Sequence, residues 1–404
     1  MAYEQVLEQL RTKHPQQESV ATSLLDILSL LAASGVPTHW LLELDDDSDA
    51  VRDTLSFLKR ASILQESIDS NKTIIHRLQG KVYRETYLSN PEKLNEARAH
   101  ATSLLNEIDV DQLENFEQQR QETRNLVEQV SAVTPQHHSH PLFSDPDFAA
   151  LLATTLRNAT DLGMPHLALA LTDSVTRAGD TLGPDHPSTL TARLSLAGAY
   201  REAGRLHEAI ALYEQNLDDR TRILGPHHPD TLTSRNNLAD AYQTAGRLHE
   251  AIELFEQNLE DSTRILGPNH PSTLTARHNL ASAYHDAGRL HEAIPLYQQT
   301  LKDSTRILGP NHPHTLTTRN NLASAYHDAG RLDEAIPLLE QTLEDRTRIL
   351  GPRHPDTLIS RDNLAGAYRA TGRFDDADSL FETPSDSEDE QDDTEEDPDR
   401  ETGD

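Results

Sequence analysis

One six-residue string, Leu-Gly-Pro-x-His-Pro, occurs five times in this chain of 404 residues, and its copies are evenly spaced. The glycines of the five copies are Gly183, Gly225, Gly267, Gly309 and Gly351, so each interval is 42 residues. The blocks 267–308 and 309–350 are identical at 34 of 42 positions. Self-similarity at a fixed period of this length is typical of proteins that stack one small structural unit many times.

Each 42-residue block predicts two helices. In the first half of the block that starts at 183, Leu196, Ala197 and Tyr200 recur at helical spacing and form an apolar stripe. Gly204 then stands where a helix would end in a left-handed residue, and 206–224 carries a second stripe. The residues that directly follow the second proline of the motif are predicted to cap the first helices: Ser188, Asp230, Ser272 and Asp356.

A single pair of helices cannot bury its apolar faces, but a stack of such pairs can. A small alanine recurs once per block, at 197, 239, 281, 323 and 365, and would let neighbouring helices approach closely. Pro295 and Pro337 fall inside second helices, where each removes one backbone hydrogen bond and should bend the helix slightly. The predicted fold class is therefore all-α, a superhelical solenoid of helical hairpins.

The repeat resembles the tetratricopeptide repeat (TPR) family. The resemblance rests on Leu-Ala-x-x-Tyr, an alanine nine residues later and an aromatic residue four beyond that, seen in Leu196, Ala197, Tyr200, Ala209 and Tyr213. The 42-residue period, Asn-Leu-Ala and Leu-Gly-x-x-His-Pro are similar to the kinesin light chain type of this family. The resemblance implies a superhelix whose concave groove binds a peptide or partner protein.

The sequence predicts a capping repeat before the array and an acidic tail after it. We predict five hairpins over 183–382, the last one truncated, and a degenerate capping repeat over 144–182. Residues 383–404 hold 12 acidic residues, one arginine and no hydrophobic residue, which predicts a disordered acidic tail. Such a tail either keeps the chain soluble or serves for docking or phosphorylation around Ser385 and Ser387.

The residues before the array predict a small module over 1–90 and a helical linker over 91–143. Segments 20–34 and 48–61 have the apolar period of helices, and 62–65 and 73–76 flank a polar turn, which predicts a β-hairpin. A further helix from about Gln79 completes a winged-helix-like pattern. Residues 73–84 resemble the winged-helix end of STAND (NB-ARC type) signalling ATPases, in which a histidine at the position of His76 contacts the nucleotide.

We expect the ATPase core of that family to be absent from this chain. Only 19 residues precede the segment 20–85, and no Gly-x-x-x-x-Gly-Lys-Ser/Thr motif occurs, since Gly80-Lys81 is followed by Val82. His76 is therefore interpreted as a packing or turn residue, which would contact a nucleotide only if a partner supplied the ATPase in trans.

Composition opposes several classes of function. The net charge of −31 opposes binding to the phosphates of nucleic acids and to anionic membranes. The absence of cysteine excludes disulfides, thiolate nucleophiles and cysteine-ligated zinc. No apolar run is long enough to span a bilayer and no secretory signal is present, so we expect a cytoplasmic protein. The preference for arginine over lysine suggests a GC-rich bacterial genome.

No motif indicates an enzyme, a metal site or a cofactor. The histidines of the five repeat loops should be separated by roughly 10 Å, one helix layer, whereas zinc needs its ligands about 2 Å from one centre. These histidines are interpreted as loop and cap residues. His137, His138 and His140 could scavenge a metal, but no partner ligands are evident.

The candidate ligand-binding residues lie on the first helices. Four asparagines, Asn237, Asn279, Asn321 and Asn363, precede the Leu-Ala pair, and residues three or four positions later share their helix face. A row of amides can donate to and accept from the backbone of an extended peptide. The alternative is that the asparagines cap or tie neighbouring hairpins together. The full predicted set is Asn236, Asn237, Asp240, Gln243, His278, Asn279, Ser282, His285, Asn320, Asn321, Ser324, His327, Asn363 and Arg369.

The sequence thus favours a non-enzymatic scaffold that binds a peptide or a partner protein in a TPR groove. The alternative is a regulatory arm of a STAND-type ATPase whose nucleotide-binding domain is absent from this chain.

Overall fold

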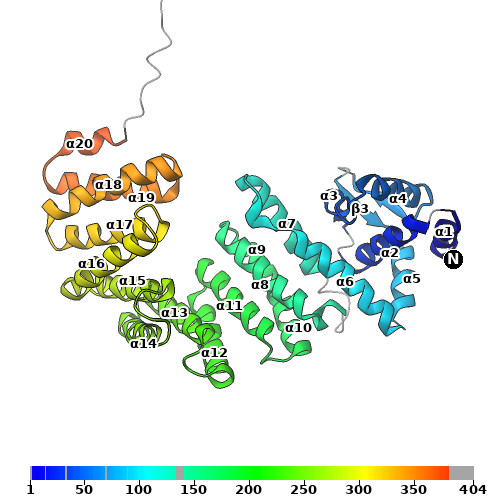
Figure 1. The fold of residues 1–404 in the computed structure, drawn as a ribbon, viewed down its shortest axis with the longest axis horizontal. Coiled ribbons are helices and arrows are strands. Elements are labelled where there is room, and N and C mark those ends of the chain that lie inside the picture. Colours follow the sequence, from blue (N-terminus) through cyan, green and yellow to red (C-terminus); the bar gives the residue numbers. More distant parts are fainter. Residues whose placement is uncertain are drawn as a thin grey trace, which may run out of the picture. The chain divides into compact units, whose positions relative to one another are not determined.

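The computed structural model describes residues 2–13, 15–31, 34–68, 71–88, 90–132 and 141–381 (Figure 1). The chain divides into two compact units, 1–254 and 255–404, and the boundary falls inside helix α14 (Leu248–Leu266). The acidic tail predicted at 383–404, and the histidines at 137, 138 and 140, lie outside the described residues.

The first unit begins with five helices and a small sheet. The helices are α1 (Ala2–Lys13), α2 (Pro15–Leu30), α3 (Thr38–Leu41), α4 (Ser48–Arg60) and α5 (Arg77–Leu88). Strands β2 (Leu64–Glu66) and β3 (Lys72–Ile75) pair antiparallel, with Leu64 opposite Ile75, which confirms the predicted hairpin. A third strand that was not predicted, β1 (Val36–Pro37), pairs with the other edge of β3.

The chain continues in helices that share one core with this module. They are α6 (Pro91–Glu107), α7 (Phe116–Ala132), α8 (Pro146–Asp161), α9 (Pro165–Ala168) and α10 (Thr172–Leu182), with short 3₁₀ turns η1 (Val110–Gln112), η2 (Pro141–Ser144) and η3 (Leu169–Leu171). A single cluster of buried apolar side chains runs from Val6 through Leu104 and Phe148 to Ala199. The segments 1–90, 91–143 and 144–182 are therefore joined by buried contacts in this unit.

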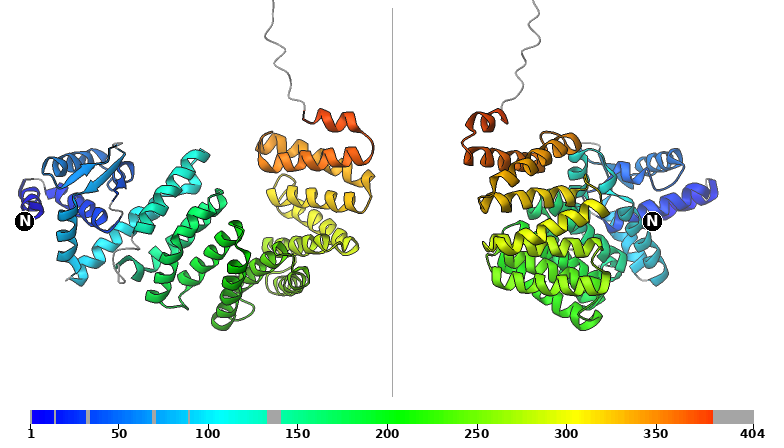
Figure 2. Two further views of the ribbon diagram at one scale, coloured as in Figure 1. Left: turned by 180° about the vertical axis from the view of Figure 1, so that it is seen from behind. Right: turned by 60° about the vertical axis from the view of Figure 1, so that its left-hand side comes forward.

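Paired helices make up the remainder of both units (Figure 2). In the first unit they are α11 (Pro187–Glu202), α12 (Leu206–Leu224) and α13 (Pro229–Thr244); in the second they are α15 (Pro271–Asp286), α16 (Leu290–Ile307), α17 (Pro313–Asp328), α18 (Leu332–Leu350), α19 (Pro355–Ala370) and α20 (Phe374–Ser379). Helices α16 and α18 continue through Pro295 and Pro337. The predicted tandem hairpins are confirmed, and the last second helix is short.

The helices end and begin where local chemistry requires it. Gly204 has φ 75°, and the amide of the following residue, Arg205, donates to the Tyr200 carbonyl at 2.8 Å, which closes α11. The N-caps predicted at Ser188, Asp230, Ser272 and Asp356 were wrong, whereas the interpretation of the loop histidines as cap residues is confirmed. Ser188 lies inside α11, and the cap is His186, whose Nδ1 accepts from the Ser188 amide at 3.2 Å. The other four copies repeat this cap with His228, His270, His312 and His354.

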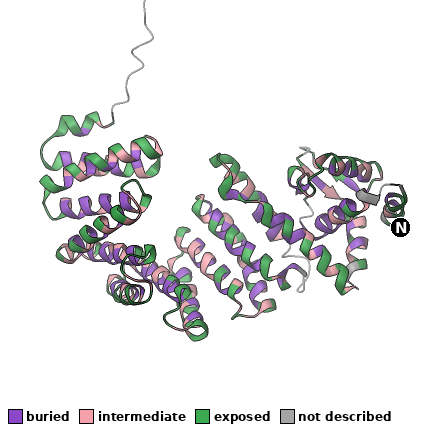
Figure 3. Cartoon of the chain, in the orientation of Figure 1, coloured by how far each residue is buried: buried purple, intermediate pink, exposed green. Residues whose placement is uncertain are grey.

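Alanine and tyrosine build the core between the paired helices. Figure 3 shows buried residues on the sides of these helices that face one another. The recurring alanine of the first helix, exemplified by Ala239, is fully buried in each copy. The recurring tyrosine joins one hairpin to the preceding one, because the Tyr242 hydroxyl on α13 donates to Glu214 on α12 at 2.7 Å. In the second unit the Tyr368 hydroxyl donates to Glu340 in the same way, at 2.6 Å.

Candidate peptide-binding surface

All 14 predicted partner-binding residues lie on first helices. The first unit holds four of them on α13, and the second unit holds four on α15, four on α17 and two on α19. Asn320 is the buried member, with 4% of its surface exposed, and Arg369 is the exposed one. The remaining twelve side chains are half-buried, so each presents part of its surface to solvent.

On α13, the predicted residues differ in the contacts that their side chains make within the protein. Asp240 forms an ion pair with Arg201 of the neighbouring first helix, α11. Asn237 makes no side-chain hydrogen bond within the described part of the chain, so its amide has both donor and acceptor capacity left for a ligand.

On α15, His278 is held by the next first helix. Its Nδ1 lies 3.0 Å from the Thr318 hydroxyl and its Nε2 lies 3.4 Å from the Asn321 amide nitrogen, both on α17. Since an amide nitrogen can only donate, Nε2 is the acceptor and Nδ1 carries the proton. Burial, and the nearby ring of His314 at 5.3 Å, lower the pKa of His278 to about 4. His278 is therefore a neutral tie between two hairpins.

On α17 and α19, amides and hydroxyls form a second inter-helix network. The Asn320 side-chain carbonyl accepts from the Ser360 hydroxyl at 3.2 Å and from the Asn363 amide at 3.4 Å. The Asn363 amide also lies 3.5 Å from the Ser324 hydroxyl. These contacts support the tying role for Asn320, while Asn321 and Asn363 remain half-buried beside it.

Three charged or titratable groups gather near the C-terminal ends of α15 and α17. His285 Nε2 and His327 Nδ1 each lie 2.9 Å from a different oxygen of the Asp328 carboxylate. Burial alone would raise the pKa of Asp328, but the hydrogen bonds from His327 and His285 outweigh it and lower that pKa. On α19, Arg369 donates to Asp378 at 3.3 Å.

Family comparison agrees with this geometry. A tetratricopeptide repeat model matches residues 189–260, 236–303, 278–346 and 315–383, and a second model of the same description matches 157–220. The array is built of tetratricopeptide repeats. Proteins built of these repeats are scaffolds for protein–protein interaction. No curated protein matches the sequence.

Several solved structures are similar to the chain. A crystal structure of nearly identical TPR-like repeats from a kinesin light chain-like protein of Podosopora anserina is 37% identical, over 48% of this chain and 92% of that one, with a TM-score of 0.43. BtubC from P. vanneervenii is 22% identical over 58% and 88%, with a TM-score of 0.43. A STAND protein with a TPR sensor from Pyrococcus horikoshii is 16% identical, with a TM-score of 0.42; the match covers 89% of this chain but 55% of that protein.

An arginine stack in the TPR hairpins was missed by the sequence reasoning. The guanidinium of Arg247, just before α14, lies 4.0 Å from the ring centre of Tyr242 on α13, and the guanidinium also donates to Glu250. The same stack recurs in the other four copies, at 3.9 to 4.6 Å. The signal was present, because an arginine follows each of these tyrosines by five residues.

The polar network of the TPR helices also has members that the sequence reasoning missed. Thr318 and Ser360 occupy the same repeat position and lie one helical turn before the Leu-Ala pair. Their hydroxyls contact His278 and Asn320, respectively. A serine or threonine on an otherwise apolar helix face was the available signal for them.

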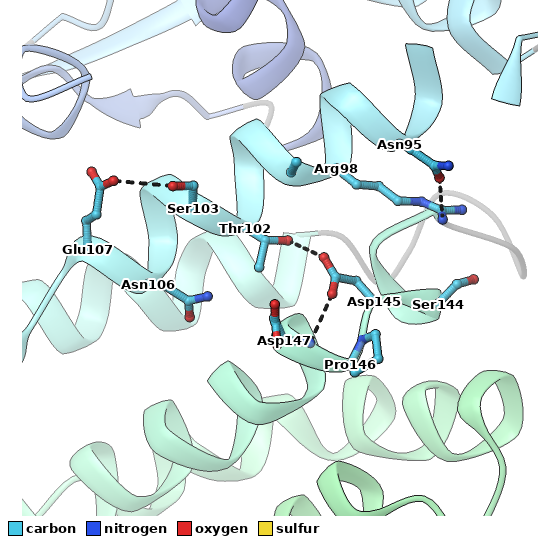
Figure 4. Close-up of a pocket in the computed structure, with 11 residues that line it drawn as sticks. Asn95, Arg98, Thr102, Ser103, Asn106, Glu107, Ser144, Asp145, Pro146 and Asp147 are labelled. Carbon is cyan, nitrogen blue, oxygen red and sulfur yellow. Dashed lines mark hydrogen bonds between the residues drawn. The ribbon is translucent and has the colours of Figure 1, made fainter. Parts of the chain in front are cut away.

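A separate pocket lies outside the TPR hairpins, in the first unit (Figure 4). It has a volume of about 580 Å³ and lies between α6 and the start of α8. Its central carboxylate, Asp145, accepts from the Thr102 hydroxyl at 2.8 Å and caps α8 through the Asp147 amide at 2.9 Å. Asp145 is therefore occupied in holding these two helices together.

Two further features are absent from the described part of the chain. Its side chains include no cluster of three or more His, Asp or Glu groups that could hold a metal ion. Its helices include none that is both long and apolar enough to cross a bilayer.

Proposed function

We propose that this protein is a scaffold that binds an extended segment of a partner protein along the first helices of its TPR hairpins. The observation that carries the proposal is the half-buried asparagine that recurs before the Leu-Ala pair in four copies, at 237, 279, 321 and 363. A recurring amide can pair with successive peptide groups of an extended chain, since it both donates and accepts.

The contacts within the repeats support a division of labour among the predicted residues. His278 and Asn320 hold neighbouring hairpins in register, whereas the side-chain amide of Asn237 keeps both its donor and its acceptor capacity for a ligand. We propose the remaining half-buried residues of the predicted set as the contact surface for the ligand. The 42-residue period and the asparagines are the features shared with kinesin light chain-like repeats, and they favour a peptide ligand.

The proposal is tested by affinity capture from the native host with the wild type and a triple variant, Asn237→Ala, Asn279→Ala and Asn321→Ala. We expect the variant to lose the partner captured by the wild type, while circular dichroism shows that its helices persist. Capture of the same partner at an unchanged level would contradict the role of the amides.

A second candidate is that the chain is the sensor arm of a STAND-type ATPase supplied in trans. The hairpin β2–β3, flanked by α2, α4 and α5, motivates the winged-helix-like interpretation of 1–90, and the buried core joins this module to the first repeat helices. This candidate predicts an ATPase gene directly upstream, and a change in that enzyme's ATP hydrolysis when the two proteins are mixed. An unchanged rate would count against it.

We propose a cytoplasmic location and no nucleic-acid or membrane partner, on the basis of the net charge of −31 and the absence of cysteine.

A further inference from the structure

The N-terminal module of the first unit has a pocket of its own, with a volume of about 850 Å³. It lies between the end of α2, the strands β2 and β3, and helix α5, and we name it the α5 pocket. Its apolar wall is formed by Leu28, Leu31, Ile74 and Ile75. The two leucines belong to the buried core of this unit, and Ile75 packs against that core. A concave apolar cavity of this size is typical of a binding site.

Three basic side chains of α5 line the same pocket. Arg77, Lys81 and Arg84 follow one another at helical spacing, which places them on one face of the helix. Arg84 is fixed there, because its Nη1 donates to the Ser29 carbonyl of α2 at 2.8 Å. Arg77 and Lys81 are exposed, and neither makes a hydrogen bond or an ion pair within the described residues. Two cations are therefore available to a ligand.

The charge of the α5 pocket is opposite to that of the protein as a whole. Among the described residues that line it, none carries a carboxylate. The pocket between α6 and α8, by contrast, has Asp145 and Asp147 in its wall, and the chain has a net charge of −31. Because most of this protein repels an anionic ligand, a local group of unpaired cations gives such a ligand one favoured place to bind.

The arrangement fits an anionic ligand that is long and partly apolar. Arg77 and Lys81 are separated by about 6 Å along the helix axis. Alternate side chains of an extended peptide, which point to the same side, are about 7 Å apart. Leu78 is 67% exposed on the same helix, so it adds apolar surface outside the pocket. A small anion would leave this surface uncovered, whereas a peptide with both carboxylates and apolar side chains would cover it.

We propose that the α5 pocket binds an acidic segment of a partner protein. Its apolar side chains lie against Leu28, Leu31 and Ile74, and its carboxylates accept charge-assisted hydrogen bonds from Arg77 and Lys81. The interaction uses none of the asparagines of the TPR helices, so it is independent of the peptide-binding surface proposed for them.

Three labelled peptides test the proposal against the full chain by fluorescence anisotropy. The first has the sequence EELLEELLEE, the second has glutamine in place of each glutamate, and the third has serine in place of each leucine. We expect the first peptide to bind at least about tenfold more tightly than either of the others. Added salt should weaken its binding, because the two cations are exposed to solvent.

The double variant Arg77→Glu, Lys81→Glu should weaken binding of the first peptide by at least about tenfold. It should fold normally, because neither side chain has a partner in the described structure. Leu78→Ser removes exposed apolar surface and should also weaken binding. The matched control is Arg60→Glu, Arg124→Glu. It makes the same change in net charge at exposed arginines outside the pocket, so it should leave binding unchanged.

No measurable binding of the first peptide, equal binding of all three, or binding that Arg77→Glu, Lys81→Glu leaves unchanged would overturn the proposal. So would displacement of the first peptide by ADP or by decanoate, because that result assigns the cations to a small anionic ligand. The Asn237→Ala, Asn279→Ala, Asn321→Ala variant should bind the first peptide as the wild type does. Loss of binding in that variant would place the peptide on the TPR helices and contradict the assignment to the α5 pocket.

Discussion

The amide nitrogen of Asn321 lies 3.4 Å from Nε2 of His278, and this contact joins helices α17 and α15. The geometry requires an unprotonated Nε2, since the amide can only donate. The other ring nitrogen, Nδ1, lies 3.0 Å from the Thr318 hydroxyl oxygen. His278 therefore supports the array only while it is neutral, and acid should loosen this joint.

The first prediction is a pH dependence of stability that His278 causes. Its folded-state pKa of about 4 lies below the ordinary value of 6.5, so the unfolded state binds more protons between these values. Stability should fall as the pH is lowered from about 6.5 to about 4, by roughly 3 kcal/mol at most for this one group.

Urea unfolding at pH 7 and pH 4.5 measures this effect. His278→Asn installs the residue found at 236 and 320, and it should reduce the loss of stability at low pH. His291→Asn changes an exposed histidine and serves as the control. An equal acid-induced loss in wild type and His278→Asn would show that His278 does not govern the effect.

The second prediction concerns the histidine caps. His312 Nδ1 accepts from the His314 amide at 3.2 Å at the start of α17. Replacing His312 by alanine should cost about 1 kcal/mol of unfolding free energy, and aspartate, a good cap, should restore most of it. Unfolding midpoints compare the two variants, and an aspartate variant no more stable than the alanine one would refute a capping role.

The third prediction concerns the arginine stacks. Arg331 lies over Tyr326 with 4.3 Å between the guanidinium carbon and the ring centre, and it also pairs with Glu334 at 2.6 Å. Arg331→Met should lower the urea midpoint of the second unit through loss of the stack and the ion pair.

The matched control for that stack is Arg348→Met on α18, the helix that Arg331 directly precedes. Arg348 has an exposed ion pair with Asp345 but no aromatic partner in the described structure. Its loss should cost about 0.5 kcal/mol or less. Equal losses for the two variants in urea unfolding would show that the ring contributes nothing.

The array was predictable because the determinants of each hairpin are local. The apolar stripes, Gly204 and the prolines fix where helices begin and end, and the 42-residue period repeats that information five times. Ser188 was the predicted N-cap of α11 because serine is a common cap residue, but the N-cap is His186, directly before Pro187. Strand β1 has two residues, too few for any periodic signal.

The candidate surface was predictable only as a row of positions on one helix face. Whether an amide faces a ligand or a neighbouring helix depends on contacts between residues about 40 positions apart, such as Asn320 with Ser360. Spacing within one helix carries no information on that pairing. The burial of Asn320 and the neutral state of His278 therefore emerged only from the packed structure.

The central claim is that the recurring amides bind an extended peptide, and an affinity measurement with a selected peptide tests it most directly. Peptides selected from a random display library against the wild-type chain would be titrated calorimetrically into the wild type and the Asn237→Ala, Asn279→Ala, Asn321→Ala variant. We predict that the variant binds at least about tenfold more weakly, with its helical content retained. Equal affinity for the two proteins would contradict the claim.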